Sequence, residues 1–289
     1  MKKMNFSSHQ FLWLALVLLF PLVNVFWRPV APNDYWWYVR IGGEMVESRA
    51  IPEVETFSYL HAGEPKINHS WLSSVLLWWL DDVGGIYLTM FIAGLSVALT
   101  YFLLWRLMLS TGLDLRWASL LLVLIEIPSS ANWALRPQLF TYPLFAATLY
   151  VLWRWEKDKK NHLWALPLLM MFWTNLHGSF ILGFVLAGVV FLFGNNDKKK
   201  LFITLALMAL ASLINPRGIG AWEFLLFGMT NTSVRQFATE WLPPVNQGFQ
   251  TNVFFASYLL LMVLVGKSAY KLSRFEWVWL LGFGWMGLA

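Results

Sequence analysis

Apolar blocks of nearly constant length recur along this sequence, and they restrict its fold more than any other feature. Hydrophobic residues make up 58% of the chain and charged residues only 13%, whereas soluble domains carry about 25% charged residues. A hydrocarbon core about 30 Å thick takes roughly 20 helical residues to cross. The sequence therefore predicts an all-α, polytopic transmembrane helical bundle with about nine spans, forming a single domain over residues 1–289. The expected spans are residues 10–27, 84–108, 117–133, 138–155, 162–176, 179–194, 201–215, 252–266 and 275–289.

The two ends of the chain carry further information about processing. Lys2 and Lys3 precede the first apolar block, as in a signal peptide, but Phe26, Trp27 and Arg28 follow it in place of a small-residue cleavage site. We therefore expect an uncleaved first span. The last block stops at Ala289 without a polar flank, and natural spans usually end in an interfacial anchor. This pattern favours a C-terminally truncated form of a longer protein.

Basic residues set the expected orientation. With a cytoplasmic N-terminus, the inside segments contain 14 of the 21 basic residues, and the long outside segments contain the other seven. This is the bias that the positive-inside rule predicts. The inside residues are Lys2, Lys3, Arg106, Arg116, Arg154, Lys157, Lys159, Lys160, Lys198, Lys199, Lys200, Lys267, Lys271 and Arg274. We expect a multi-pass protein of the inner (plasma) membrane.

Two outside segments, residues 28–83 and 216–251, are longer than simple connectors. Residues 71–80 (WLSSVLLWWL) form an apolar stretch too short to span, and two aspartates follow it. Residues 221–229 (AWEFLLFGM) have the same character. Tryptophan prefers the membrane interface, so both stretches are expected to be interfacial helices in outer loops.

Several functional classes are disfavoured. The chain has no cysteine, which excludes disulfides and thiolate metal sites. No HExxH, HxH or DxD spacing is present and no nucleotide-binding loop appears, so neither a metal nor another cofactor is expected. The net charge of +5 does not indicate nucleic acid, because the basic residues lie in short loops between spans.

Polar residues that interrupt the apolar sequence all fall at or beyond the outer ends of expected spans. Ionisable groups at such positions are costly unless they face a cavity or a partner, and they mark functional sites. The pattern predicts an active site that faces the periplasm or exterior. The residues are Asp34, Arg40, Glu44, His69, Glu126, Arg136, Gln138, Asn175, His177, Asn215, Arg217 and Glu240, with Trp241 beside the last.

Each candidate also has a structural interpretation. Asp34 is expected to cap the helix that follows it, alone or together with a role in proton transfer. Arg40 and Glu44 are four residues apart and either pair with each other or contact substrate. His69 is either structural or a proton shuttle or phosphate ligand.

Arg136 and Arg217 each lie at an outer span junction beside a turn-forming residue. Guanidinium groups suit bidentate phosphate binding, either of a lipid-borne substrate phosphate or of ordinary phospholipid headgroups. Asn175 and His177 occupy the outer turn between two expected spans, where they line a cavity or are buried.

The outer aspartate, the following WWYVRIGGEMVESRAIPEVETFSYLHAGEPKINHSWL, and then ALRPQLFTYPLF, NLHGSFILG, NPRG and EWLPP resemble bacterial members of the C-fold (GT-C) glycosyltransferases. The resemblance runs in order through nearly the whole chain. It implies a cell-envelope transferase that moves a hexosyl or pentosyl group from a polyprenyl-phosphate-linked sugar to a glycan, lipid or protein acceptor.

The resemblance also implies roles for individual residues. Asp34 would take the proton from the acceptor hydroxyl in an inverting single displacement. Arg136 and Arg217 would hold the departing lipid phosphate. The substrate pocket would be lined by Arg40, Glu44, His69, Gln138, Asn175, His177 and Glu240.

Two other classes remain open from the sequence. A multi-span transporter or lipid flippase also carries internal polar groups, although transporters place them near the bilayer midplane in paired repeats, and neither feature is found here. A non-catalytic membrane scaffold would use the same outer loops to bind partners.

Overall fold

The structure of the chain is a computed structural model that describes residues 8–28, 30, 34–231 and 243–288. Helices dominate these residues, and their only extended pairing is an isolated antiparallel bridge between Val54 and Pro65. The all-α prediction is confirmed for the described part of the chain. The α-helices are α1 Ser8–Trp27, α2 Asp34–Ser48, α3 Trp71–Ser110, α4 Leu115–Ser129, α5 Tyr142–Asp158, α6 Ala165–Leu176, α7 Ile181–Phe193, α8 Lys198–Ser212, α9 Gly220–Thr230, α11 Phe249–Lys267 and α12 Arg274–Leu288.

Three helical segments are long and apolar enough to cross a membrane: His9–Trp27, Trp71–Ser110 and Phe249–Lys267. All nine segments that the sequence predicts as spans coincide with helices, but the other six helices are shorter. Two expected boundaries shift because 3-10 turns replace α-helix at the ends that the sequence places outside. These turns are η1 Ser130–Asn132 after α4 and η2 Pro137–Phe140 before α5.

The expected interfacial helix at residues 71–80 and the second expected span belong to one element, α3, which is interrupted by a kink. Gly84 and Gly85 leave the helical conformation there, and Gly85 has φ 63° and ψ −168°. Only glycine adopts that combination without strain. The kink lies where the sequence places the boundary between interface and span.

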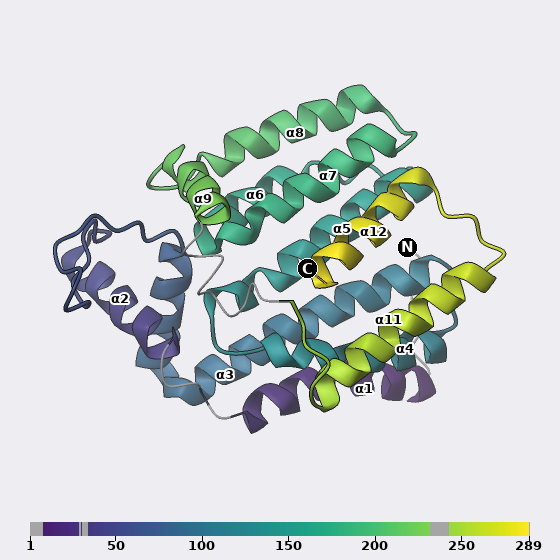
Figure 1. The fold of residues 1–289 in the computed structure, drawn as a ribbon, viewed down its shortest axis with the longest axis horizontal. Coiled ribbons are helices and arrows are strands. Elements are labelled where there is room, and N and C mark those ends of the chain that lie inside the picture. The colour runs from purple at the N-terminus through teal and green to yellow at the C-terminus, as the bar shows by residue number, and fades with distance from the viewer. Residues whose placement is uncertain (1–7, 29, 31–33, 232–242, 289) are drawn as a thin grey trace.

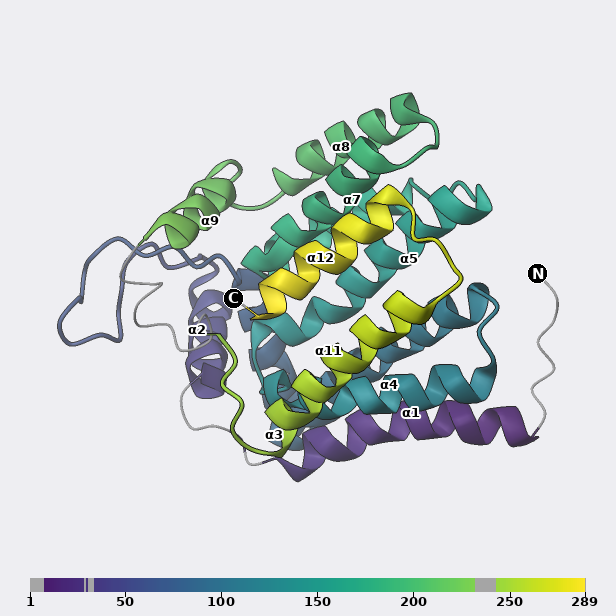
Figure 2. The same cartoon turned by 45° about the vertical axis from the view of Figure 1, so that its right-hand side comes forward.

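The connections of the bundle divide between two ends (Figures 1 and 2). In both views the α3–α4, α5–α6, α7–α8 and α11–α12 connections lie at one end, and α2, the α2–α3 loop (residues 49–70) and α9 lie at the other. The first group contains the short basic segments that the sequence places inside. The second group contains parts of the two long segments that the sequence places outside, and it includes the candidates Asp34, Arg40, Glu44 and His69.

Two hydrophobic clusters hold the bundle together. One joins α5, α6, α7, α8 and α12 around Trp155 and Trp173, and the other joins α1, α3 and α4 around Trp105 and Trp133. Large apolar side chains also cover the outside, among them Leu259 at 66% exposure, and α11 buries none of its residues. An apolar exterior around an apolar interior is what a lipid environment favours.

Close packing of α2 on α3 places the first candidate residue. A Cβ atom at Gly42 would overlap the backbone carbonyl of Ser74, so only glycine allows the two helices to approach this closely. Tyr35 reinforces the contact, because its buried hydroxyl donates a hydrogen bond of 2.6 Å to Asp81 Oδ1 and lies 3.3 Å from Thr89 Oγ1. Asp81 precedes the kink in α3 and Thr89 follows it, so α2 is fixed to both sides.

Candidate functional site

Asp34 and Arg136 form an ion pair at the end of the bundle where α2 lies (Figure 1). The sequence predicts that Asp34 caps the helix that follows it, but Asp34 is itself the first residue of α2. Its Oδ2 lies 2.5 Å from Arg136 Nη2, and both side chains are partly exposed, at 39% and 26%. The structure therefore brings together the expected base and one of the two expected phosphate ligands.

Local sequence explains the position of Arg136. Its backbone is extended, as the residue before a proline prefers, and Pro137 then begins η2. The turn is fixed to α3 because Ser96 Oγ donates a hydrogen bond of 2.7 Å to the carbonyl of Leu139. Leu139 is itself buried. The turn that follows Arg136 is thus held in place by a hydrogen bond to α3 and by the burial of the Leu139 side chain.

Tyr35, which joins α2 to α3, also holds the start of α2 in place. Burial, and secondly the hydrogen bond to Asp81, raises the pKa of the Tyr35 hydroxyl. The hydroxyl therefore keeps its proton at neutral pH and remains a donor. Tyr35 follows Asp34 directly, so this contact also fixes the backbone that carries the candidate base.

A second group of candidates surrounds His69. The imidazole stacks on Phe224 of α9 at a centroid distance of 4.2 Å and meets the ring of His177 edge-on at 6.0 Å. Burial, and secondly the neighbouring His177, lowers the pKa of His69 to about 3. His69 is therefore neutral at pH 7, and it offers hydrogen bonds to a ligand but no positive charge.

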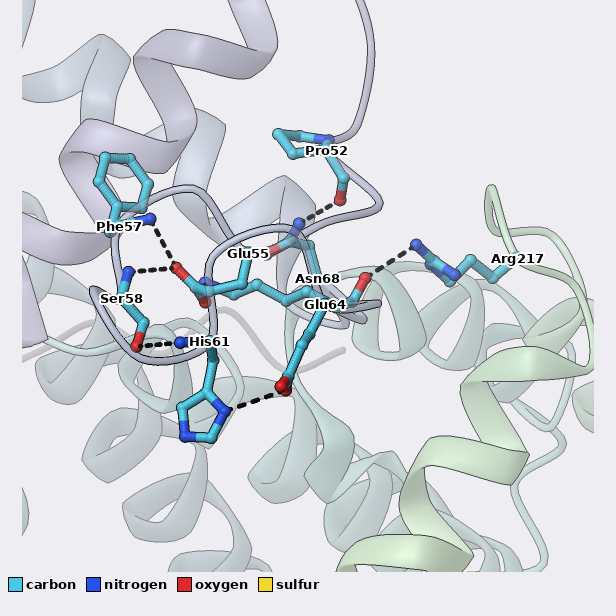
Figure 3. A network of polar contacts seen from close by, with 9 residues as sticks. Pro52, Glu55, Phe57, Ser58, His61, Glu64, Asn68 and Arg217 are labelled. Carbon is cyan, nitrogen blue, oxygen red and sulfur yellow. Dashed lines mark hydrogen bonds and ion pairs between the residues drawn. The ribbon is translucent and has the colours of Figure 1, made fainter.

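Arg217 lies beside this histidine. Its Nη2 donates a hydrogen bond of 3.3 Å to the carbonyl of Lys66, which Figure 3 shows as a contact between Arg217 and the α2–α3 loop. Its Nε is buried and has no hydrogen-bond partner among the described residues. A cavity of about 10 Å³, close to the size of one water molecule, is lined by Arg217, His69 and Asn215 among others.

An ion pair organises the α2–α3 loop that Arg217 contacts. Glu55 Oε2 lies 2.5 Å from Lys66 Nζ, and Glu55 Oε1 accepts hydrogen bonds from the backbone N–H groups of Phe57 and Ser58 (Figure 3). The bond to Lys66 is the main reason why the pKa of Glu55 falls to about 2. Lys66 Nζ also lies 4.3 Å from the ring centroid of Trp37 on α2. The loop is thereby attached to the helix that begins with Asp34.

The side chain of Asn175 hydrogen-bonds three separate segments of the protein. Its Oδ1 accepts a hydrogen bond of 2.8 Å from Trp71 Nε1, and its Nδ2 donates to the carbonyls of Met171 and Ile214. These bonds join the start of α3, the end of α6 and the segment that leads to Arg217. Most of the hydrogen-bonding capacity of the amide is used by the protein itself.

The Asp34–Arg136 pair and the residues around His69 are connected through the hydroxyl side chains of Ser179 and Thr141. His177 Nδ1 accepts a hydrogen bond of 3.1 Å from the backbone N–H of Ser179, whose hydroxyl is 3.3 Å from Thr141 Oγ1. Thr141 is the C-cap of the turn η2, which begins after Arg136. Although Asp34, Arg136 and His177 do not line the small cavity beside Arg217, the two groups are neighbours at one end of the bundle.

The remaining expected site residues have varied positions. Arg40 and Glu44 pair with each other at 3.6 Å on the surface of α2. Gln138 lies in η2, where its carbonyl accepts a bond from Thr141 Oγ1. Glu126 is fully buried in α4. Glu240, and Trp241 beside it, lie outside the described residues.

Sequence reasoning missed the residues that position the site. Tyr35, Asp81 and Phe224 act through partners far away in the chain, and a single sequence gives no signal for such pairs. Lys66 and Glu55 also pair across a loop. In the part of the chain that the structure describes, no group of three or more His, Asp or Glu side chains lies close enough to hold a metal ion.

No protein-family model, curated protein or solved structure matches this chain.

Proposed function

We propose that this chain is a membrane glycosyltransferase that moves a sugar from a polyprenyl-phosphate donor to an acceptor hydroxyl on the outer face of the membrane. One observation carries the proposal. The ion pair between Asp34 and Arg136 joins a carboxylate that follows the first helix to a guanidinium at a later helix junction. A base next to a phosphate-binding cation is the minimum that such a transfer needs.

In this mechanism the carboxylate of Asp34 takes the proton from the acceptor hydroxyl. The hydroxyl oxygen forms a bond to the anomeric carbon while the bond from that carbon to the phosphate oxygen breaks, and the configuration inverts. The leaving group is the polyprenyl phosphate, whose added negative charge is balanced by Arg136. The ion pair keeps both groups in position before substrate arrives, which reduces the entropic cost of reaching the transition state.

The second group extends the site toward the rest of the substrate. Arg217 supplies a further cation, and its buried Nε has no protein partner among the described residues. His69 is neutral at pH 7, so its role is hydrogen bonding to a sugar or acceptor and not charge pairing. In this proposal the phosphate lies at the arginines and the sugar near the two histidines.

The proposal includes the topology. All nine long apolar segments cross the inner membrane, the N-terminus is cytoplasmic, and the end with α2 and α9 faces the periplasm or exterior. The apolar exterior and the placement of the basic connections at the opposite end support this arrangement (Figures 1 and 2). A lipid-borne phosphate would then meet Arg136 and Arg217 at the membrane surface.

A transfer assay tests the proposal. Purified protein is supplied with radiolabelled polyprenyl-phosphate sugars and a membrane extract as the source of acceptor. Loss of a general base typically costs 100-fold or more, so Asp34→Asn is expected to reduce transfer by about that factor.

The chain offers a matched control. Asp158 Oδ2 lies 2.5 Å from Arg154 Nε at the opposite end of α5, so Asp158→Asn breaks an ion pair of equal length. This control variant is expected to retain transfer. Undiminished transfer by Asp34→Asn overturns the role of Asp34, and counter-flow of a solute without any transfer favours a transporter.

A further inference from the structure

Glu126 is an acidic side chain that the proposed reaction does not use. It lies in the last turn of α4 and has no solvent exposure. Helix α4 packs against α1, α3 and α11, and both views show it between α1 and α11 (Figures 1 and 2). The carboxyl group is therefore enclosed by helices.

Neither oxygen of Glu126 receives a hydrogen bond from any residue that the structure describes. The hydroxyls nearest in sequence are directed elsewhere, because Ser129 Oγ pairs with Tyr101 and Ser130 Oγ donates to the carbonyl of Ile127. No ion pair within the described ranges includes Glu126. Buried polar groups without a partner are rare enough to require an explanation.

The charged and titratable groups around it do not compensate a negative charge. At the end of α1, Arg28 contacts Asn24, Ser130 and the carbonyl of Ala131. Helix α3 contributes Tyr101 and α5 contributes Tyr142, whose hydroxyl donates to the carbonyl of Asn132. Helix α11 contributes the uncharged Gln250, bonded to Ser130. Beyond these, Arg136 pairs with Asp34.

A buried carboxylate without a cation or donor is unstable relative to its neutral form, because its desolvation is not repaid. We propose that Glu126 is a proton-binding site separate from the candidate active site. Its carboxyl group retains a proton at neutral pH, and packing of α4 between α1 and α11 depends on that proton. Loss of the proton places a negative charge among these helices and separates them.

Two measurements on the purified chain in detergent test this inference. Infrared spectroscopy separates the C=O stretch of a protonated carboxylic acid from the bands of carboxylates. At pH 7, the difference spectrum between wild type and Glu126→Gln is expected to contain a carboxylic-acid band. Glu44→Gln, which removes the partly exposed acid of the Arg40 pair, is the control and is expected to remove no such band.

The second measurement follows equilibrium unfolding with pH. An exposed glutamate in the unfolded chain is ionised above about pH 5. If folded Glu126 keeps its proton, the unfolding equilibrium constant of wild type rises about tenfold per pH unit relative to Glu126→Gln between pH 5 and pH 7. A missing acid band, as for a carboxylate solvated by internal water, overturns the proposal. Parallel pH profiles of the two proteins overturn it as well.

Discussion

Among individual side chains, His69 is the one whose chemistry depends most on its surroundings. A histidine in an outer loop is compatible with a charged phosphate ligand or a proton shuttle. Its position between Phe224 and His177 removes the first role, since burial lowers its pKa to about 3. The positive charge of the site therefore comes from arginine.

The low pKa of His69 predicts a specific acid sensitivity. In the unfolded chain its pKa is about 6.5, so acidification below that value protonates the unfolded state first. The stabilising contribution is complete above pH 6.5 and declines as the pH falls toward 3. Between pH 7 and pH 5, wild type is expected to lose about 2 kcal/mol of unfolding free energy from this group. His69→Phe keeps an aromatic ring on Phe224 and removes that loss.

The measurement is chemical unfolding of both proteins in detergent at the two pH values. His162→Phe, which removes an exposed histidine from the α5–α6 connection, is the control and should lose stability as wild type does. Equal losses in His69→Phe and wild type would contradict the assignment of a neutral, buried imidazole.

Among the elements, α3 determines how the end of the bundle that contains α2 is assembled. Its first part carries Asp81, which binds Tyr35, and its second part continues through the bundle. The kink at Gly84 and Gly85 sets the angle between the two parts. Helix α2, with Asp34 at its start, is attached to both sides of that kink through Tyr35.

Replacement of Gly85 by alanine tests the kink. An added Cβ meets no atom within 4 Å, so any cost arises from the backbone at φ 63° and not from crowding. We expect Gly85→Ala to reduce the unfolding free energy by about 1–3 kcal/mol.

Gly188 is a matched control, because an added Cβ there also meets nothing within 4 Å but the residue lies inside α7. Gly188→Ala is expected to stabilise the protein by about 0.5–1 kcal/mol through its helical propensity. Stabilisation by both variants in thermal or chemical unfolding would show that Gly85 is not under backbone constraint.

For the whole molecule, the separation of the two ends is the feature from which the proposed orientation follows. The α5–α6 connection lies at the basic end, and the α2–α3 loop lies at the opposite end (Figures 1 and 2). Positive charge is retained on the cytoplasmic side during insertion. The candidate site is therefore expected on the other side.

The absence of cysteine makes this orientation measurable. Single cysteines are introduced at Ala62, exposed in the α2–α3 loop, or at Asn161, exposed in the α5–α6 connection. In sealed right-side-out vesicles, a membrane-impermeant maleimide is expected to label Ala62→Cys only. Asn161→Cys should react after detergent is added. Labelling of the two variants in the reverse order would place the candidate site in the cytoplasm.

The sequence alone was sufficient to predict the helical class and the positions of the long apolar segments, because hydrophobic runs and helix ends are local properties. The boundary that it places between the apolar stretch 71–80 and the next span coincides with the kink at Gly84 and Gly85. Segment 138–155 was less accurate, since Pro137 begins a 3-10 turn whose form depends on the contact of Leu139 with α3.

Only the tertiary structure decided which of these polar residues contact one another. It pairs Asp34 with Arg136, pairs Arg40 with Glu44, and leaves Glu126 enclosed without a donor among the described residues. The sequence assigns all of these residues to the same outer end. Each polar side chain could pair with several of the others there. The choice among partners follows from helix packing and burial, which are set by contacts between residues distant in the chain.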